Sequence, residues 1–173
     1  AAVNPFYGSM RDLPDEAFEK ILGTNIMANH WLVNLVLPGM IERKDGAIII
    51  VSSIGGLRGH DTLGAYCISK AADLQLVRNL AVEHGQHNVR VNAICPGSVA
   101  GDRIERVIAA EAESRKRTPD EVRAEYVSGQ SIKRFPEAEE IADLCVFLAS
   151  DKAKMISGQA LPIDGNTETY HMG

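Results

Sequence analysis

A tyrosine and a lysine stand four residues apart in the segment "YCISK", as Tyr66 and Lys70. In a helix, side chains with this spacing lie on the same face, so the phenol and the ammonium would be neighbours. A nearby positive charge favours the ionised phenolate, which can exchange a proton with a bound hydroxyl. The pair is therefore either an incidental surface pair or a general acid/base.

The composition is typical of one soluble globular domain, with 45% hydrophobic and 24% charged residues among 173. A net charge of -5 disfavours a nucleic-acid partner, because phosphate binding needs clustered Lys and Arg. Cys67, Cys95 and Cys145 show no metal-ligand spacing, so we expect reduced thiols and no metal site. No signal peptide or membrane-spanning stretch is visible, and we expect a cytoplasmic protein without a membrane partner.

Helical and strand patterns alternate along the chain. Apolar, β-branched runs alternating with amphipathic segments predict an α/β fold, with a parallel sheet and helices on both faces. The first helical pattern falters near Gly23–Asn25. Strands are expected within 46–53, 88–97 and 158–165, and helices within 15–43, 64–84, 101–117, 118–129 and 136–150.

Polar residues follow the ends of the predicted strands. Ser53 ends the first strand, Tyr66 and Lys70 begin the next helix, and Pro96 and Gly97 end the second strand. Because ligands of parallel α/β sheets bind at the carboxyl ends of the strands, we expect these groups to form one site. Asn25, where the earlier helix is irregular, and Val99, after the second strand, belong to the same set.

This ordered set resembles the short-chain dehydrogenase/reductase family of the classical type. Ser53 precedes Tyr66 by thirteen residues, and "VRVNAICPGSV" follows the tyrosine and lysine as in the family. "LGTNIMANHWL" matches the helix of the family's catalytic asparagine, and "PEAEEIADLCVFLASDKAKMISGQALPIDG" matches its C-terminal pattern. The resemblance covers essentially all 173 residues and implies the C-terminal part of a Rossmann-like, doubly wound parallel sheet in a single domain, 1–173.

The resemblance implies an NAD(P)-dependent oxidoreductase that interconverts a secondary alcohol and a ketone. Tyr66 would be the general acid/base, and Lys70 would also bind the nicotinamide ribose. Ser53 would hold the substrate oxygen, and Asn25 would anchor a water that links Lys70 to solvent. The cofactor, NAD or NADP, would lie against Tyr66, Lys70, Pro96, Gly97 and Val99.

The resemblance also implies a helical substrate-covering segment at 101–135 and a homodimer or homotetramer formed through the helices within 25–43 and 64–84. Asn92 is interpreted as a structural amide between strand and loop, and Arg103 and Arg106 as solvated residues or contacts of an anionic substrate.

One departure from the family is large. The glycine-rich phosphate loop, TGxxxGxG, and the first strands are not among these residues, so we expect a missing N-terminal half on the same or another chain. A non-catalytic binding or scaffold chain is the alternative function. A nucleotide-sugar epimerase or dehydratase is less favoured, because eight residues after "DG" leave no room for a sugar-binding domain.

Overall fold

The computed structural model describes residues 2–167, which contain one sheet of three parallel strands. The strands are β1 (Gly46–Val51), β2 (Val89–Pro96) and β3 (Ala160–Ile163), in the order β1-β2-β3. The register pairs Gly46 with Val89 and Val51 with Ile94, and β3 joins β2 where Ala160 meets Ala93. The predicted parallel α/β sheet is confirmed.

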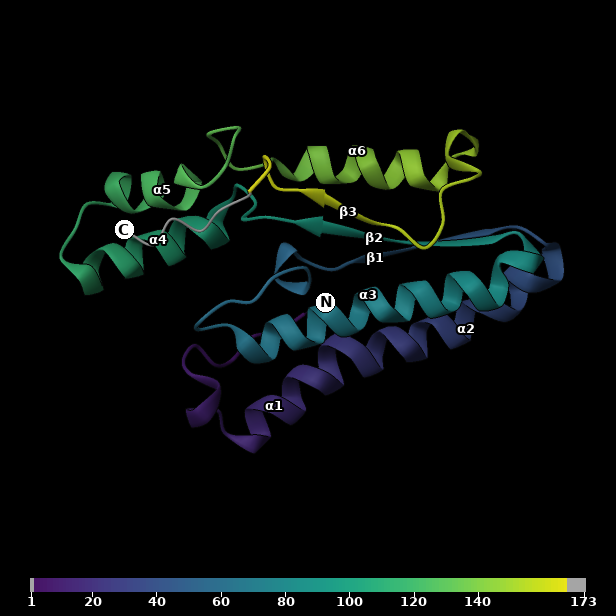
Figure 1. The fold of residues 1–173 in the computed structure, drawn as a ribbon, viewed down its shortest axis with the longest axis horizontal. Coiled ribbons are helices and arrows are strands. Elements are labelled where there is room, and N and C mark those ends of the chain that lie inside the picture. Colours follow the sequence, from purple (N-terminus) through teal and green to yellow (C-terminus); the bar gives the residue numbers. More distant parts are fainter. Residues whose placement is uncertain (1, 168–173) are drawn as a thin grey trace.

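Helices cover both faces of the sheet (Figure 1). On one face lie α1 (Asp15–Leu22), α2 (Ala28–Arg43) and α3 (Gly64–His84), and on the other lies α6 (Ala138–Ala149). Alternate strand residues supply the two cores, as the pleat of a strand requires. Ile48, Ile50, Val91 and Ala93 pack with α2 and α3, whereas Ile49, Ile94 and Leu161 pack with α6.

The predicted irregularity in the first helix is present as a π-helical turn. Residues Gly23–Met27 (η2) join α1 to α2 without breaking the helical path. Asn25 is the buried residue of this turn. Four short 3₁₀ segments complete the connections, namely η1 (Met10–Asp12), η3 (Ile54–Gly56), η4 (Gly85–His87) and η5 (Asp151–Ala153).

Two helices, α4 (Asp102–Arg115) and α5 (Pro119–Ser128), form a hairpin beyond the carboxyl ends of the strands (Figure 1). The hairpin has a hydrophobic cluster of its own, built on Ile108, Ala112, Val122 and Phe135. Thr118 caps α5 through a capping box with Glu121, and Arg123 donates to both carboxylate oxygens of Glu105 on α4. The segment 101–135 is thus helical and lies where the substrate-covering segment was predicted; its covering role stays a prediction.

The apolar run of β1 is not buried along its whole length. Val51, at the end of β1, is 50% exposed. The reason is that, within residues 2–167, β1 has a hydrogen-bonded neighbour only on its β2 side. Within the same residues, no helix combines the length and the apolarity that crossing a bilayer would need.

The loop after β1 packs so closely on α3 that a side chain is excluded at Gly56. A Cβ atom there would lie 2.7 Å from both the backbone carbon and the backbone oxygen of Lys70. We expect Gly56→Ala to lower the free energy of unfolding by about 1–3 kcal/mol, because backbone atoms have to move apart. Chemical denaturation of the natural gene product measures this change.

Gly59→Ala, in the same loop, is the matched control, because a Cβ atom at Gly59 would meet nothing within 4 Å. We expect this control to change the stability by less than about 0.5 kcal/mol. Equal effects of the two substitutions would show that the close packing at Gly56 does not contribute to stability.

Candidate active site

Tyr66 and Lys70 lie in the first two turns of α3, which begins at Gly64. The Lys70 Nζ atom lies 5.8 Å from the centroid of the Tyr66 ring. Lys70 is buried, so its ammonium acts on the ring through little intervening water. The predicted juxtaposition of the two side chains is present.

The Lys70 side chain is anchored by the end of β1 and by its own helix. Its Nζ atom donates to the backbone oxygen of Val51 and to Asp73 Oδ2, each over 3.1 Å. The backbone oxygen of Lys70 in turn accepts a 2.9 Å hydrogen bond from Ser52 Oγ. These bonds fix the start of α3 against the carboxyl end of β1.

Asp73 is a fully buried partner of Lys70 that the sequence analysis did not single out. Its Oδ1 atom accepts a 2.8 Å hydrogen bond from Asn29 Nδ2 on α2. Burial raises the pKa of Asp73, while the Lys70 charge and the hydrogen bonds from Asn29 and Lys70 oppose that rise. The sequence carries one sign of this contact: Asp73 follows Lys70 by three residues, which places the two side chains on the same face of a helix.

Asn25 is held in the π-helical turn by three side-chain hydrogen bonds. Its Oδ1 atom accepts from the backbone N–H of Val3 over 2.8 Å, and its Nδ2 atom donates to the Val3 oxygen over 3.1 Å. Nδ2 also donates to Ser69 Oγ over 3.0 Å. The Asn25 backbone oxygen accepts from Asn29 Nδ2 over 2.9 Å. Asn25 is therefore connected through protein groups toward Lys70; its water-anchoring role stays a prediction.

Ser53 follows β1 and caps the 3₁₀ segment η3, where its Oγ atom accepts a 3.1 Å hydrogen bond from the Gly55 N–H. Gly55 lies between the serine and the tyrosine. A Cβ atom at Gly55 would lie 3.5 Å from Ser53 Oγ and 3.7 Å from Tyr66 Cε1. Ser53 Oγ and the edge of the Tyr66 ring therefore both lie close to Gly55, and the meeting of the two side chains in one site stays a prediction.

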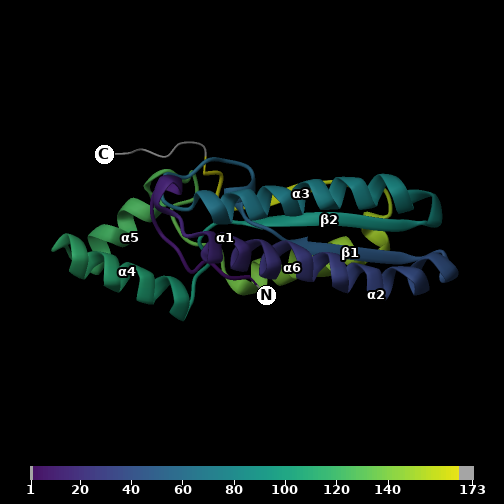
Figure 2. The ribbon, with the colours of Figure 1, turned by 90° about the horizontal axis from the view of Figure 1, so that it is seen from below.

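An open groove of about 540 Å³ follows the edge of β1 that has no strand neighbour among residues 2–167, and Tyr66 and Lys70 line one part of it. It runs along β1 and α2, which lie side by side in Figure 2. Its wall along β1 and α2 is apolar, and the part near Tyr66 is polar and includes Arg103 from α4. The lining residues are Ala2, Asn29, Leu32, Val33, Val36, Ile48, Ile49, Ile50, Val51, Ser52, Tyr66, Lys70 and Arg103.

Pro96 and Gly97 lie at the carboxyl end of β2, and Ser53 follows the carboxyl end of the parallel neighbour β1. The Gly97 N–H donates to the Ile163 oxygen over 2.9 Å, and a Cβ atom at Gly97 would lie 3.1 Å from the Asp164 Cβ. Gly97 thus permits the loops after β2 and β3 to approach closely. The cofactor contacts of Pro96, Gly97 and Val99 stay predictions, because none of these three residues is in the described lining of the groove.

Asn92 is structural, as predicted. Its Nδ2 atom donates to the Ile156 oxygen over 2.8 Å, and its Oδ1 atom accepts from the Gln159 N–H over 3.1 Å. These two bonds fix the loop that leads into β3. The amide therefore ties β2 to the loop before β3.

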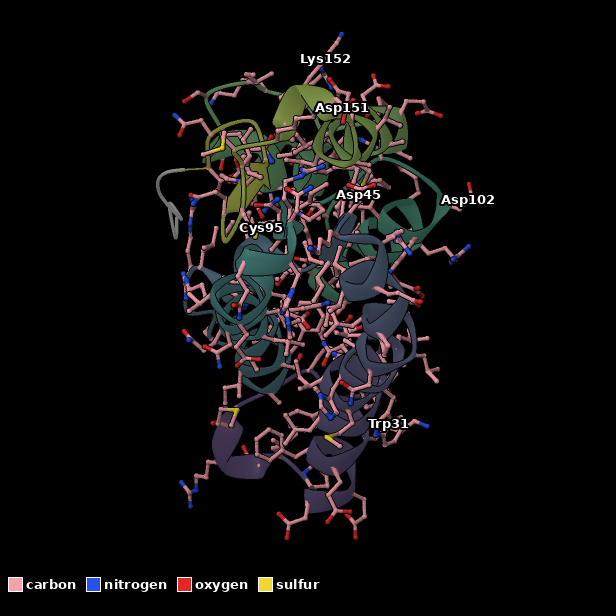
Figure 3. All side chains as sticks on the ribbon, turned by 90° about the vertical axis from the view of Figure 1, so that its right-hand side faces the viewer. Trp31, Asp45, Cys95, Asp102, Asp151 and Lys152 are labelled. Atoms are coloured by element: carbon pink, nitrogen blue, oxygen red, sulfur yellow. The ribbon has the colours of Figure 1, made fainter. Side chains whose placement is uncertain are left out.

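The cysteines near the site behave as buried apolar residues. Cys67 and Cys95 are buried free thiols, and burial raises the pKa of both. Figure 3 shows Cys95 in the interior of the molecule, whereas Trp31 lies at the periphery of α2. A raised pKa keeps a thiol protonated at neutral pH and unreactive as a nucleophile. The interpretation of these two cysteines as small hydrophobic residues is confirmed.

Comparison with known proteins shows relatives across nearly the whole chain. A model of the family described as enoyl-(acyl carrier protein) reductase matches residues 1–166. The bovine protein "dehydrogenase/reductase SDR family member 4" is 38% identical over 98% of this chain and 58% of its own length. The Xanthobacter autotrophicus protein "2-(S)-hydroxypropyl-CoM dehydrogenase 3" is 34% identical over 92% of this chain and 60% of its own.

Among solved structures, carveol dehydrogenase from Mycobacterium avium in complex with NAD superposes with a TM-score of 0.86 at 26% identity. The match covers 96% of this chain and 62% of that one. The chain thus spans about three fifths of the length of these curated relatives and of this structure.

The hydrogen bonds of Asn25 generate a stability prediction. We expect Asn25→Ala to lower the free energy of unfolding by about 2–4 kcal/mol, because the backbone groups of Val3 would lose their partners in a buried place. Asn34→Ala, at an exposed position of α2, is the control and should cost less than about 0.5 kcal/mol. Comparable losses in denaturant unfolding of both variants would contradict a special role for Asn25.

Proposed function

The chain belongs to the short-chain dehydrogenase/reductase family, whose members are oxidoreductases, and on that premise we propose that it interconverts a secondary alcohol and a ketone with NAD or NADP. The observation that carries the proposal is the buried Lys70 ammonium beside the Tyr66 ring at the carboxyl end of β1. The name of the Xanthobacter relative, a hydroxypropyl dehydrogenase, supports a secondary alcohol as the substrate class.

Tyr66 is the proposed general acid/base. In the direction of oxidation, its phenolate accepts the proton of the substrate hydroxyl; in the direction of reduction, the phenol returns that proton to the forming alcohol. The positive charge of Lys70 attracts the negative charge that the phenolate carries during this exchange, and its Nζ atom lies 5.8 Å from the centroid of the Tyr66 ring. Ser53, which like the edge of the Tyr66 ring lies close to Gly55, donates a hydrogen bond to the substrate oxygen and holds it beside the phenol.

The residues of the site fit a dinucleotide cofactor. The described lining of the groove contains two cationic side chains, Lys70 and Arg103, and no carboxylate, which suits an anionic ligand. When bound, the nicotinamide supplies or accepts the hydride. Tyr66 and Lys70 would hold the ribose end, and the loop containing Pro96, Gly97 and Val99 would hold the nicotinamide.

Removing the Tyr66 hydroxyl tests the proposal directly. We expect Tyr66→Phe to lower kcat by about 10²–10⁴-fold, because the proton exchange loses its acid/base while the ring packing is kept. The measurement is steady-state oxidation of a panel of secondary alcohols with NAD and NADP, using the natural gene product.

Tyr7→Phe is the control, since Tyr7 is 62% exposed and lies outside the site. We expect it to keep the kcat of the unsubstituted protein. If Tyr66→Phe retained a normal kcat, the assignment of Tyr66 as the acid/base would be wrong.

We also propose that the protein self-associates through α2 and α3. Trp31, Leu35, Ile68 and Val82 are large apolar residues on these helices and are 57%, 78%, 45% and 85% exposed. Apolar side chains exposed on adjacent helices favour contact with another surface. A second copy of the same face is the proposed partner, in a dimer or tetramer.

A charge in this face should weaken the association. We expect Leu35→Asp to raise the dimer Kd by about 10-fold or more, because the carboxylate would have to be buried at the interface. Met155→Asp, at a still more exposed apolar residue outside α2 and α3, is the control and should leave the Kd unchanged. Sedimentation of the natural gene product measures both, and a monomer at micromolar concentration would refute the proposal.

A further inference from the structure

The ion pair between Lys70 and Asp73 is almost completely removed from solvent. The Lys70 side chain is 4% exposed and the Asp73 side chain 0%. A buried charge is tolerated when an opposite charge and hydrogen bonds replace its water. We propose that Asp73, oriented by Asn29, is the positioning residue that holds the Lys70 ammonium in place for the proton exchange at Tyr66; this role rests on the proposed function.

Asn29 fixes the Asp73 carboxylate from the neighbouring helix. Its Nδ2 atom donates to Asp73 Oδ1 over 2.8 Å and to the Asn25 backbone oxygen over 2.9 Å. Both N–H bonds of the amide are thereby used, and its orientation is set by the π-helical turn that carries Asn25. The carboxylate therefore presents Oδ2 to Lys70 in one direction.

The arrangement leaves Lys70 with a donor for a ligand. An ammonium has three N–H bonds, and among the described residues two are directed at the Val51 oxygen and at Asp73. Lys70 also lines the groove, so the third bond is available on that side. The lysine side chain is a flexible chain of four methylene groups, and the two hydrogen bonds to protein acceptors restrict its conformation.

The titratable groups that face the ion pair come from three elements. Tyr66 shares α3 with it, Cys95 faces it from β2 with its pKa raised by burial, and Arg103 of α4 lines the same groove. Asn29, from α2, is neutral. Among these groups Asp73 is the carboxylate in direct contact with Lys70, so its removal changes the local charge balance most.

A double-substitution cycle tests the proposal on the natural gene product, using Lys70→Met, Asp73→Asn and the double variant. We expect Asp73→Asn to lower kcat by about 10–100-fold in the presence of Lys70 and by less than about 3-fold in its absence, because Asp73 acts through the lysine. Asp143→Asn, an exposed carboxylate on α6, is the control and should keep full activity.

The pH profile separates positioning from a purely structural role. Asp73→Asn removes a negative charge that lies 3.1 Å from Lys70 Nζ in the parent protein, so the alkaline limb of the kcat/KM profile should move to lower pH. The proposal would be overturned if the pH profile kept its shape and if the double variant lost kcat by the product of the two single losses.

Stability supplies a readout that does not depend on turnover. In Lys70→Met, Asp73 loses the charge that opposes its raised pKa, so its folded pKa rises further above the unfolded value. A raised carboxyl pKa contributes stability below the unfolded pKa, and this contribution is lost as pH rises through the folded pKa. The unfolding midpoint of Lys70→Met should therefore fall with rising pH more steeply than that of the parent, and the double variant should remove this extra slope.

The outcomes distinguish this inference from the proposed function. If Tyr66→Phe kept normal turnover, the catalytic function would be overturned and the positioning role with it. This holds even if the unfolding midpoints of Lys70→Met and the double variant depend on pH as predicted. Loss of turnover in Tyr66→Phe with normal turnover and pH profile in Asp73→Asn would overturn the positioning role alone. If Asp73→Asn does not fold, Asn29→Ala replaces it, with an expected 3–10-fold loss of kcat and the same shift of the alkaline limb.

Discussion

The ammonium of Lys70 is buried, and a buried cation requires the protein to replace its water with acceptors and negative charge. Three parts of the fold meet this requirement. The end of β1 offers the Val51 oxygen, α3 offers Asp73, and Asn29 of α2 holds that carboxylate in place. The relative positions of β1, α2 and α3 are therefore fixed at the point where Tyr66 lies.

Several local features were predictable from the sequence because they depend on short-range chemistry. The approximate strand limits, the long helix 64–84 and the irregular turn at Gly23–Asn25 all follow from periodicity and glycine placement. The catalytic roles came from resemblance to a family, since spacing alone leaves an exposed helix pair equally acceptable.

Asp73 and Asn29 were not predictable in the same way. Each is a polar residue on a helix, and such residues are most often solvated. Their contact with each other depends on how α2 crosses α3, which is a tertiary property. Arg103 shows the same dependence, because only the position of α4 relative to β1 decides whether its guanidinium reaches the groove or remains on a solvated face.

The hairpin of α4 and α5 has its own apolar cluster and its own charged contacts, separate from the two cores that hold the sheet. Substitutions within the hairpin can therefore change its own packing without entering either core of the sheet. In evolutionary terms, the hairpin is a unit whose sequence can diverge while the strands and α3 are inherited unchanged.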